Sequence, residues 1–582
     1  MPQQFRFSPR PNRAHEIQWQ PWSKEAFANA TAADRPILLC LTAVWCHWCH
    51  QMDENTYSDS ALIELINQHF VPIRVDADQY PHVQDRYIAG GWPTNAFLTP
   101  TGEVLWSGTY IEAEQFAAVA DGVRNAWTER RAELGVEIER RRKALEAARG
   151  RGSVAGMVRR EAADDVWASL LESFDARNGG FGDAPKYPTP EALELLFVRS
   201  DEGDAARIAM QTLDGMLAGE LWDANHGGFF RYALTQEWTQ PQTEKLLSIN
   251  AGLLRAYVLG AHLHNRADWR AIAERLVTTV EQTLPLQSGL WASSQAAAPE
   301  FYAALPEKRG GLDAPGVDGV LYTSVNAQWI RALADAGARL QRSDWIERAE
   351  SALAQLLSEM AAPNDLMYHF REPGGDPQLP YLLLDTLEAA RACISVSQAT
   401  GKSENLLRAR AFVSAIEKSF WADESGFYDR TRTTHDVGVL RYRDRPFDVN
   451  ADMARLLIDL SLALGERSYR ALAERTLAFL SPSAGRYGVG GAPFATAVHE
   501  FFDPPLQVFV VGTGPDADAL RKTALALPIA HRRVWPLPKG GRIGTQTFAV
   551  RDTAVAYATG PHGASPPISD PAGLADAMTH VA

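Results

Sequence analysis

The stretch "AVWCHWCH", residues 43–50, places two cysteines and two histidines within five consecutive positions. It overlaps "PILLCLTAV" (36–44), a continuous apolar run that is typical of a strand buried on both faces. A strand that leads into W-C-x-x-C at the start of a helix is typical of a redox dithiol. Unpaired backbone N–H groups at the helix start favour a thiolate at Cys46. We therefore predict that Cys46 is the nucleophile and that Cys49 resolves the mixed disulfide.

The segments that follow predict a small mixed sheet around this dithiol. "ALIELINQHF" (61–70) is a helical pattern, "VPIRVDAD" (71–78) is a second buried strand, and residues 94–108 form two short strands joined by a Pro-Thr-Gly turn. The order βαβ followed by a hairpin, with "GGWP" (90–93) before the hairpin, predicts a thioredoxin-like fold. Pro93 is then expected to be cis and to face the dithiol.

Two other interpretations of the cysteines are less favoured. A zinc site needs two more ligands, because C-x-x-C supplies only half of a tetrahedron, and purely structural thiols are seldom paired at a helix start. We expect no metal and no cofactor. His47, when protonated, is expected to stabilise the thiolate and to tune the redox potential. Cys40 stands on the first strand where thioredoxins carry a buried Asp, and we interpret it as a small buried hydrophobic residue.

Composition narrows the class of protein. The chain has 582 residues, which suggests about three or four structural units, and a net charge of −14. That charge argues against nucleic acid or an anionic membrane as partner, because phosphate binding needs a basic surface. Three of the four cysteines lie within ten positions, as expected for a reduced compartment with one specialised thiol site. The absence of an apolar leader and of a long apolar run predicts a cytoplasmic protein.

From about Glu112 onward the pattern is almost entirely helical. Residues 124–152 predict a charged linker helix. Beyond it, glycine-aromatic or related turns recur six times between helical pairs, which predicts an (α/α)6 toroid because each pair must stack on its neighbours. These turns are 178–183, 226–231, 288–293, 364–370, 425–430 and 484–491. The predicted domains are a thioredoxin-like unit (1–125), a linker helix (126–155), the toroid (156–560) and a C-terminal tail (561–582).

The two halves together resemble a widespread family of thioredoxin-domain proteins. The resemblance rests on "WCHWCHQM" (45–52), "FVPIRVDADQYPHV" (70–83), "GGWPTNAFLTPTG" (90–102), "GGFGDAPKYPTP" (179–190) and "GGFFRYALTQEWTQPQTEK" (227–245). It implies a thioredoxin-like domain joined to a six-hairpin domain similar to glycosidases and sugar 2-epimerases. It implies the fold more firmly than any reaction, because the activity of that family is largely unassigned.

The chain departs from this family in the toroid. Gln242, Ser248 and Ile249 stand where the family carries His, Tyr and Asp, so several polar groups expected at the mouth of the toroid are missing. A sugar-processing cavity needs two carboxylates or a His/acid pair. The candidate binding residues near the turn ends are Arg231, Tyr232, Glu244, Lys245, Asp318, His369, Asp385, Asp448 and His499.

Three functions remain open at this point. The first is a thiol–disulfide oxidoreductase fused to a toroid that binds a protein disulfide, a small molecule or a sugar. The second is a sugar isomerase or epimerase with a regulatory dithiol. The third is a binding scaffold without catalytic activity. In each case neither nucleic acid nor a membrane is expected as partner.

Overall fold

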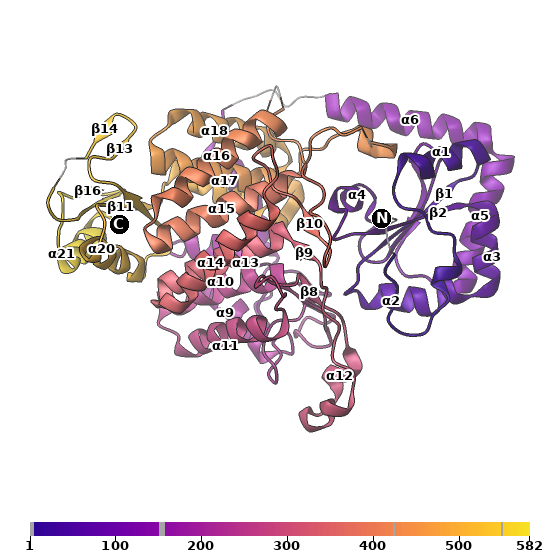
Figure 1. The fold of residues 1–582 in the computed structure, drawn as a ribbon, viewed down its shortest axis with the longest axis horizontal. Helices are drawn as coiled ribbons and strands as arrows, with labels where there is room; N and C mark the ends of the chain where they lie inside the picture. Colours follow the sequence, from indigo (N-terminus) through magenta and orange to yellow (C-terminus); the bar gives the residue numbers. More distant parts are fainter. Residues whose placement is uncertain (1–4, 151–156, 423–424, 435, 549–550) are drawn as a thin grey trace.

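The structure, a computed structural model, describes residues 5–150, 157–422, 425–434, 436–548 and 551–582. Three units follow one another along the chain (Figure 1). The N-terminal unit is an α/β layer, a helical toroid occupies the middle, and a second α/β unit lies at the opposite end of the toroid. In this part of the chain, no helix combines the length and the apolar character needed to cross a membrane.

The N-terminal unit has the predicted thioredoxin-like fold. Its sheet has the order β2-β1-β3-β4, with β1 (Ile37–Thr42) parallel to β2 (Val71–Asp76) and antiparallel to β3 (Thr94–Leu98). Every residue of β1 is buried, as its continuous apolar run predicts. The sheet ends with β4 (Val104–Gly108), and the helices of the unit are α1 (Lys24–Ala33), α2 (His47–Glu54), α3 (Ser60–His69), α4 (Pro81–Tyr87) and α5 (Ala113–Glu129).

The expected linker of residues 126–155 is occupied by the end of α5 and by α6 (Arg131–Gly150). Its residues 151–155 lie outside the described part of the chain. Ion pairs three or four residues apart, such as Glu137 with Arg140 and with Arg141, run along the exposed surface of α6. Such pairs support a solvated helix that has little apolar surface to bury.

The middle unit is the predicted (α/α)6 toroid. Six inner helices contact one another in the cyclic order α8, α10, α13, α15, α17, α19 and back to α8. The inner helices are α8 (Pro190–Val198), α10 (Leu247–His264), α13 (Thr323–Leu340), α15 (Leu383–Thr400), α17 (Phe447–Leu464) and α19 (Ala492–Phe502). The outer helices are α7 (Asp164–Glu172), α9 (Ala205–Ala218), α11 (Ala267–Thr283), α14 (Ser343–Met360), α16 (Ser403–Phe420) and α18 (Arg467–Leu480).

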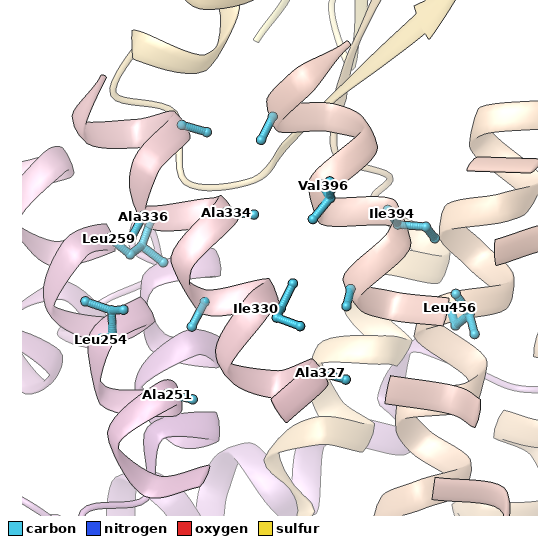
Figure 2. Close-up of a cluster of buried hydrophobic side chains, with 14 of the residues drawn as sticks. Ala251, Leu254, Leu259, Ala327, Ile330, Ala334, Ala336, Ile394, Val396 and Leu456 are labelled. Carbon is cyan, nitrogen blue, oxygen red and sulfur yellow. The ribbon is translucent and has the colours of Figure 1, made fainter. Parts of the chain in front are cut away.

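Small and branched apolar side chains hold neighbouring inner helices together. Figure 2 shows Leu259 of α10 beside Ala336 of α13, while Ile330 of α13 points toward α15. All three side chains are buried, and close approach of the helices follows from the alanine-rich faces. The ring is therefore a packed wall rather than a loose bundle.

Each glycine-aromatic turn predicted from the sequence lies before an inner helix, in some cases with short elements in between. At three of these turns a buried Asn from the first turn of the helix holds the turn through backbone hydrogen bonds. Asn250 accepts from the amide of Phe229 at 2.8 Å and donates to its carbonyl at 3.1 Å. Asn326 and Asn450 make the same pair of bonds with Trp291 and Phe427. The sequence repeat therefore has a structural basis, because in each case one amide side chain satisfies two otherwise buried backbone groups.

The loops before the inner helices carry only short elements at the end of the toroid that meets the N-terminal unit. These are β5 (Tyr232–Ala233), β6 (Pro241–Gln242), β7 (Lys245–Leu246), β8 (Ser294–Gln295), α12 (Pro299–Ala303), β9 (Leu321–Tyr322) and β10 (Phe370–Arg371).

The C-terminal boundary differs from the prediction. The toroid ends with α19, and residues from Leu506 onward form a second α/β unit that includes the segment 561–582 expected to be a tail. Its sheet has the order β12-β11-β15-β16, with β11 parallel to β12 and antiparallel to β15, so it repeats the strand order and directions of the N-terminal sheet. Its elements are β11 (Leu506–Val511), α20 (Pro515–Ala526), β12 (Arg532–Leu537), β13 (Arg542–Ile543), β14 (Gln546–Thr547), β15 (Val555–Gly560), β16 (Gly563–Ala564) and α21 (Pro571–Val581).

The physical reason for this difference is burial of α21. Leu574, Met578 and Val581 are buried on one face of the helix, which packs against α20 and β15. Asp570 caps the helix by accepting from the amide of Gly573 at 2.7 Å. A capped helix with an apolar face is a structural element rather than a tail.

Candidate functional site

The two cysteines of the dithiol lie at the start of α2, as predicted. Cys46 is the N-cap residue, and its Sγ accepts a hydrogen bond from the amide of Cys49 at 3.1 Å. Both thiols are free, and both are buried, with Cys46 only 1% exposed. Burial and the hydrogen bond to Cys46 raise the pKa of the Cys49 thiol well above its usual value. Cys49 is therefore a protonated thiol near pH 7.

A buried ion pair lies beneath the dithiol. Arg74 of β2 bonds Asp53 of α2 through both guanidinium ends, at 2.9 and 2.8 Å, and both side chains are almost fully buried. The Sγ of Cys40 lies 4.0 Å from the same guanidinium. Burial raises the pKa of Cys40 to about 12. Cys40 thus stays a neutral thiol near pH 7, and the acid that thioredoxins carry at this position is replaced by the Arg74–Asp53 pair nearby.

The loop before β3 faces the dithiol, and its Trp92–Pro93 peptide bond is cis, which confirms the prediction for Pro93. The indole of Trp92 packs edge-on against that of Trp45, with ring centres 5.4 Å apart. The Arg231 guanidinium of the toroid lies over both rings, 4.7 Å from Trp45 and 5.0 Å from Trp92. The surface between the dithiol and the cis-proline loop is therefore covered by the toroid.

Glu244 of the toroid lies over the start of α2 and extends the covered surface. Its Oε1 accepts from the backbone amide of His47 at 3.3 Å and lies 3.8 Å from the Arg231 guanidinium. Burial raises the pKa of the Glu244 carboxyl, and Arg231 opposes that shift. Its Oε2 is buried and has no hydrogen-bond partner among the described residues. A toroid carboxyl group thus shares the helix N-terminus with Cys46.

A groove runs beside this cover, between the N-terminal arm, α2 and the loops around α12. It encloses about 1280 Å³, and His47, His50 and Trp45 contribute to its wall from the dithiol segment. Burial lowers the pKa of His47 and of His50. A lowered pKa disfavours the protonated form of His47, which was expected from the sequence to stabilise the thiolate and tune the redox potential. Two imidazoles whose neutral form is favoured therefore line this groove.

A cluster of acids lies on the other side of Trp45. The indole Nε1 of Trp45 donates to Asp78 Oδ2 at 2.7 Å, and the Asp78 carbonyl contacts His369 Nε2 at 2.8 Å. His369 in turn contacts Asp385 at 2.9 Å, and this partner raises the His369 pKa against the effect of burial. Asp318 is paired with Arg6 at 2.7 Å. Burial, with Asp76 and Asp318 nearby, raises the pKa of Asp78 to about 7.

The other predicted toroid residues do not join one site. Tyr232 stacks on Tyr187 next to Arg231, with ring centres 4.7 Å apart. Lys245 is buried in a turn, where it bonds Asp223 at 2.7 Å and the carbonyl of Gly227. Asp448 stands in the first turn of α17, and His499 lies on α19 at 3.8 Å from Asp503. These four residues come from four different elements, and none of the contacts above joins one of them to another.

Sequence reasoning missed the residues that line the centre of the toroid. A cavity of about 490 Å³ is walled by charged side chains from all six inner helices, and by residues at the start of β12. The signal was present as charged residues three, four or eight positions apart inside otherwise apolar helices, for example Arg331, Asp335 and Arg339 on α13. Such spacing places them on one face of a helix. In the described part of the chain, no group of three His, Cys, Asp or Glu residues is arranged to hold a metal ion.

Comparison with known proteins supports the resemblance found in the sequence. Residues 10–146 match the Thioredox_DsbH family, described as a protein of unknown function, DUF255. The chain is also 31% identical to human spermatogenesis-associated protein 20 over 304 residues, which are 48% of this chain and 38% of that protein. The rat protein of the same name is 29% identical over 349 residues, or 52% of this chain and 44% of that one. The chain spans less than half of the length of these curated relatives.

Solved structures align with the toroid. A cellobiose 2-epimerase from Spirochaeta thermophila aligns over 59% of this chain and 94% of its own, with 15% identity and a TM-score of 0.47. A family 76 mannosidase from Bacteroides thetaiotaomicron aligns over 59% and 98%, with 12% identity and a TM-score of 0.41.

Proposed function

We propose that this protein is a thiol–disulfide oxidoreductase that acts on a low-molecular-mass disulfide at the interface between its N-terminal unit and its toroid. One observation carries the proposal: a free Cys46–Cys49 pair lies at the start of α2 beside a cis-proline loop, and toroid side chains cover that face. A folded protein disulfide needs an open surface on which to dock. The groove whose wall includes Trp45 and His47, the residues on either side of Cys46 in the sequence, has room for a small disulfide.

The chemistry follows from the two thiols. The Cys46 thiolate attacks one sulfur of the substrate disulfide, forms a mixed disulfide and releases the first substrate thiolate. Cys49 then loses its proton and attacks the Cys46 sulfur, so that the second substrate thiolate leaves and a Cys46–Cys49 disulfide remains. An external dithiol reduces that disulfide and restores the starting state. A reducing compartment, such as the cytoplasm expected from the sequence, would supply this dithiol.

A single-turnover reaction tests the proposal. The reduced and desalted protein is mixed with excess bis(2-hydroxyethyl) disulfide, and the remaining thiols are counted by alkylation and mass spectrometry. We expect the wild type to lose two thiols as one intramolecular disulfide at Cys46 and Cys49. Cys46→Ser should lose none at these positions, while Cys49→Ser should accumulate the mixed disulfide at Cys46.

Cys393→Ala is the matched control, because Cys393 is a buried free thiol on α15 and should leave the reaction unchanged. Wild-type thiol loss that persists in Cys46→Ser would refute the redox assignment. Insulin serves as the protein disulfide in a parallel reaction. Faster reaction with insulin than with the small disulfide would refute the choice of substrate.

A further inference from the structure

The cavity at the centre of the toroid is lined by an unusual number of charges. Fourteen arginine, aspartate and glutamate side chains face about 490 Å³ of space, whereas such side chains are rarely buried unless they are paired. The arginines are Arg255, Arg331, Arg339, Arg391, Arg455, Arg532 and Arg533, and the acids are Glu191, Glu194, Asp335, Glu388, Asp452, Asp459 and Glu500.

Some of these charged side chains form ion pairs with one another. Glu194 of α8 bonds Arg255 of α10 at 3.0 Å and Arg455 of α17 at 2.9 Å, and Arg455 also bonds Glu500 of α19 at 3.0 Å. Arg255 reaches Asp335 of α13 at 3.1 Å. These bidentate and bridging contacts satisfy the charges concerned and join the inner helices to one another.

Arg331 is not paired in this way. Its nearest ion-pair partner is Glu388, and the Nη1 to Oε2 distance is 3.6 Å, too long for a hydrogen bond. In the described part of the chain, Arg331 Nε and Glu388 Oε2 are both buried without a hydrogen-bond partner. Glu388 bonds Arg391 at 2.8 Å through its other oxygen, so its side chain is held in place. One donor and one acceptor therefore remain unsatisfied at the cavity wall, which costs free energy unless a ligand pairs them.

The positive charge of Arg331 is also only partly offset by its surroundings. Arg391 and Arg255 lie close to Arg331, and together with burial they lower the Arg331 pKa to about 10. Arg339 and Arg532, farther along the cavity, bond only backbone carbonyls through their guanidinium groups, among the contacts of the described residues. The lining as a whole carries seven acids and seven arginines, so the imbalance is local, and an anion beside Arg331 would offset it.

The cavity is poorly suited to an uncharged sugar. Apart from Tyr187 at its rim, no Phe, Tyr or Trp of the described residues lines it, so a sugar ring finds little aromatic surface on which to stack. Its volume is that of an ordinary small-ligand site. The charged lining instead fits a small molecule that is itself charged.

We propose that this cavity binds a small organic anion, whose acid group pairs with the Arg331 guanidinium and whose adjacent hydroxyl or ammonium group donates to Glu388 Oε2. The guanidinium fork matches carboxylate geometry, and Glu388 is positioned by Arg391 to accept from the ligand. The site is separate from the dithiol and does not depend on thiol–disulfide exchange. A ligand in this cavity would, however, lie inside the toroid, which is the unit that covers the dithiol.

Isothermal titration calorimetry on the full chain tests this site with four probes: malate, which carries a hydroxyl group; aspartate, which carries an ammonium group; sulfate, which carries no donor; and uncharged glucose. We expect malate or aspartate to bind more tightly than sulfate and glucose not to bind. Arg331→Met should weaken the organic anion at least tenfold, and Arg331→Lys, which keeps the charge but loses the fork, should weaken it less. Glu388→Gln should weaken malate or aspartate but not sulfate.

Arg140→Met on α6 is the matched control, because Arg140 is an exposed arginine outside the toroid, and binding should be unchanged. Arg331→Lys also guards against misfolding of the methionine variant, since it preserves a buried cation. Failure of the wild type to bind malate and aspartate at millimolar concentration would overturn the proposal. Binding that Arg331→Met and Arg331→Lys both leave unchanged would overturn it as well.

Discussion

At the scale of single residues, the acid–base groups around the dithiol differ from those expected on its strand. Cys40 cannot exchange a proton near neutral pH, because burial raises its pKa to about 12. Two carboxyls outside β1 have pKa values that burial raises above the usual value for an acid. Glu244 reaches the start of α2 from the toroid, and Asp78 bonds the indole of Trp45. The chain thus places two carboxyls with raised pKa values beside the dithiol helix, in addition to the Arg74–Asp53 pair beneath it.

Asp78→Asn tests the raised pKa of Asp78 through stability. The folded-state pKa of about 7 lies above the unfolded value of 3.8, so the unfolded chain releases its proton first as pH rises. The ionised Asp78 therefore destabilises the folded state progressively from about pH 4 to about pH 7 and by a constant amount above that. We expect Asp78→Asn to gain stability relative to the wild type across this window, measured as the urea midpoint by tryptophan fluorescence.

Asparagine can still accept the hydrogen bond from Trp45, so the comparison isolates the charge. Asp121→Asn is the control, because Asp121 lies on the surface of the same unit in an exposed pair with Arg124. A difference between Asp78→Asn and the wild type that stays constant from pH 4 to pH 8 would show that Asp78 titrates normally.

At the scale of elements, α2 is where the two functional halves of the chain meet. Its N-terminus presents amide groups to Cys46 Sγ and to the Glu244 carboxylate at the same time. A carboxylate at this position disfavours a second negative charge nearby. We therefore expect the toroid to restrain negative charge at this helix start through one side chain.

Glu244→Gln should relieve that restraint. The amide side chain can still accept from His47, but it carries no charge, so the Cys46 thiolate is favoured. We expect Cys46 to be alkylated by iodoacetamide roughly three to ten times faster at pH 7, which corresponds to about 0.7–1.4 kcal/mol of charge interaction. Glu300→Gln is the control, since Glu300 is an exposed acid on the nearby α12. Equal rates in wild type and Glu244→Gln would mean that the carboxylate does not act on Cys46.

Most helices and strands could be predicted from the sequence, whereas the contacts between distant segments could not. The buried run 36–44, the W-C-x-x-C motif and Pro93 are local signals, and each predicted its element correctly. The six turns predicted the toroid because each precedes an inner helix. The contact of Glu244 with His47 spans 197 positions, and no local pattern encodes such a pairing. The helix α21 was missed because its apolar face is short and lies in a glycine- and proline-rich segment.

At the scale of the whole molecule, the toroid is enclosed between two α/β units of the same strand order. The C-terminal unit contributes Arg532 and Arg533 to the cavity, whereas the N-terminal unit docks on the opposite end. That docking uses ion pairs between the units. Arg86 bonds Asp429 at 2.8 Å with both side chains buried, and Glu103 bonds Arg441 at 2.7 Å. Access to the dithiol then depends on how firmly these pairs hold the interface.

Arg86→Met should loosen this interface and expose Cys46. Removing Arg86 leaves Asp429 buried without its 2.8 Å partner and with Arg430 4.0 Å away, and breaking a buried pair typically costs about 3–5 kcal/mol. We expect a bulky poly(ethylene glycol) maleimide to modify Cys46 several times faster in the variant, while a small maleimide gains less. The double variant Arg86→Met/Asp429→Leu should restore slow modification, because it removes both charges. Arg124→Met, which breaks an exposed pair in the same unit, should behave as wild type. If the bulky and small reagents gain equally in Arg86→Met, the toroid does not control access to the dithiol.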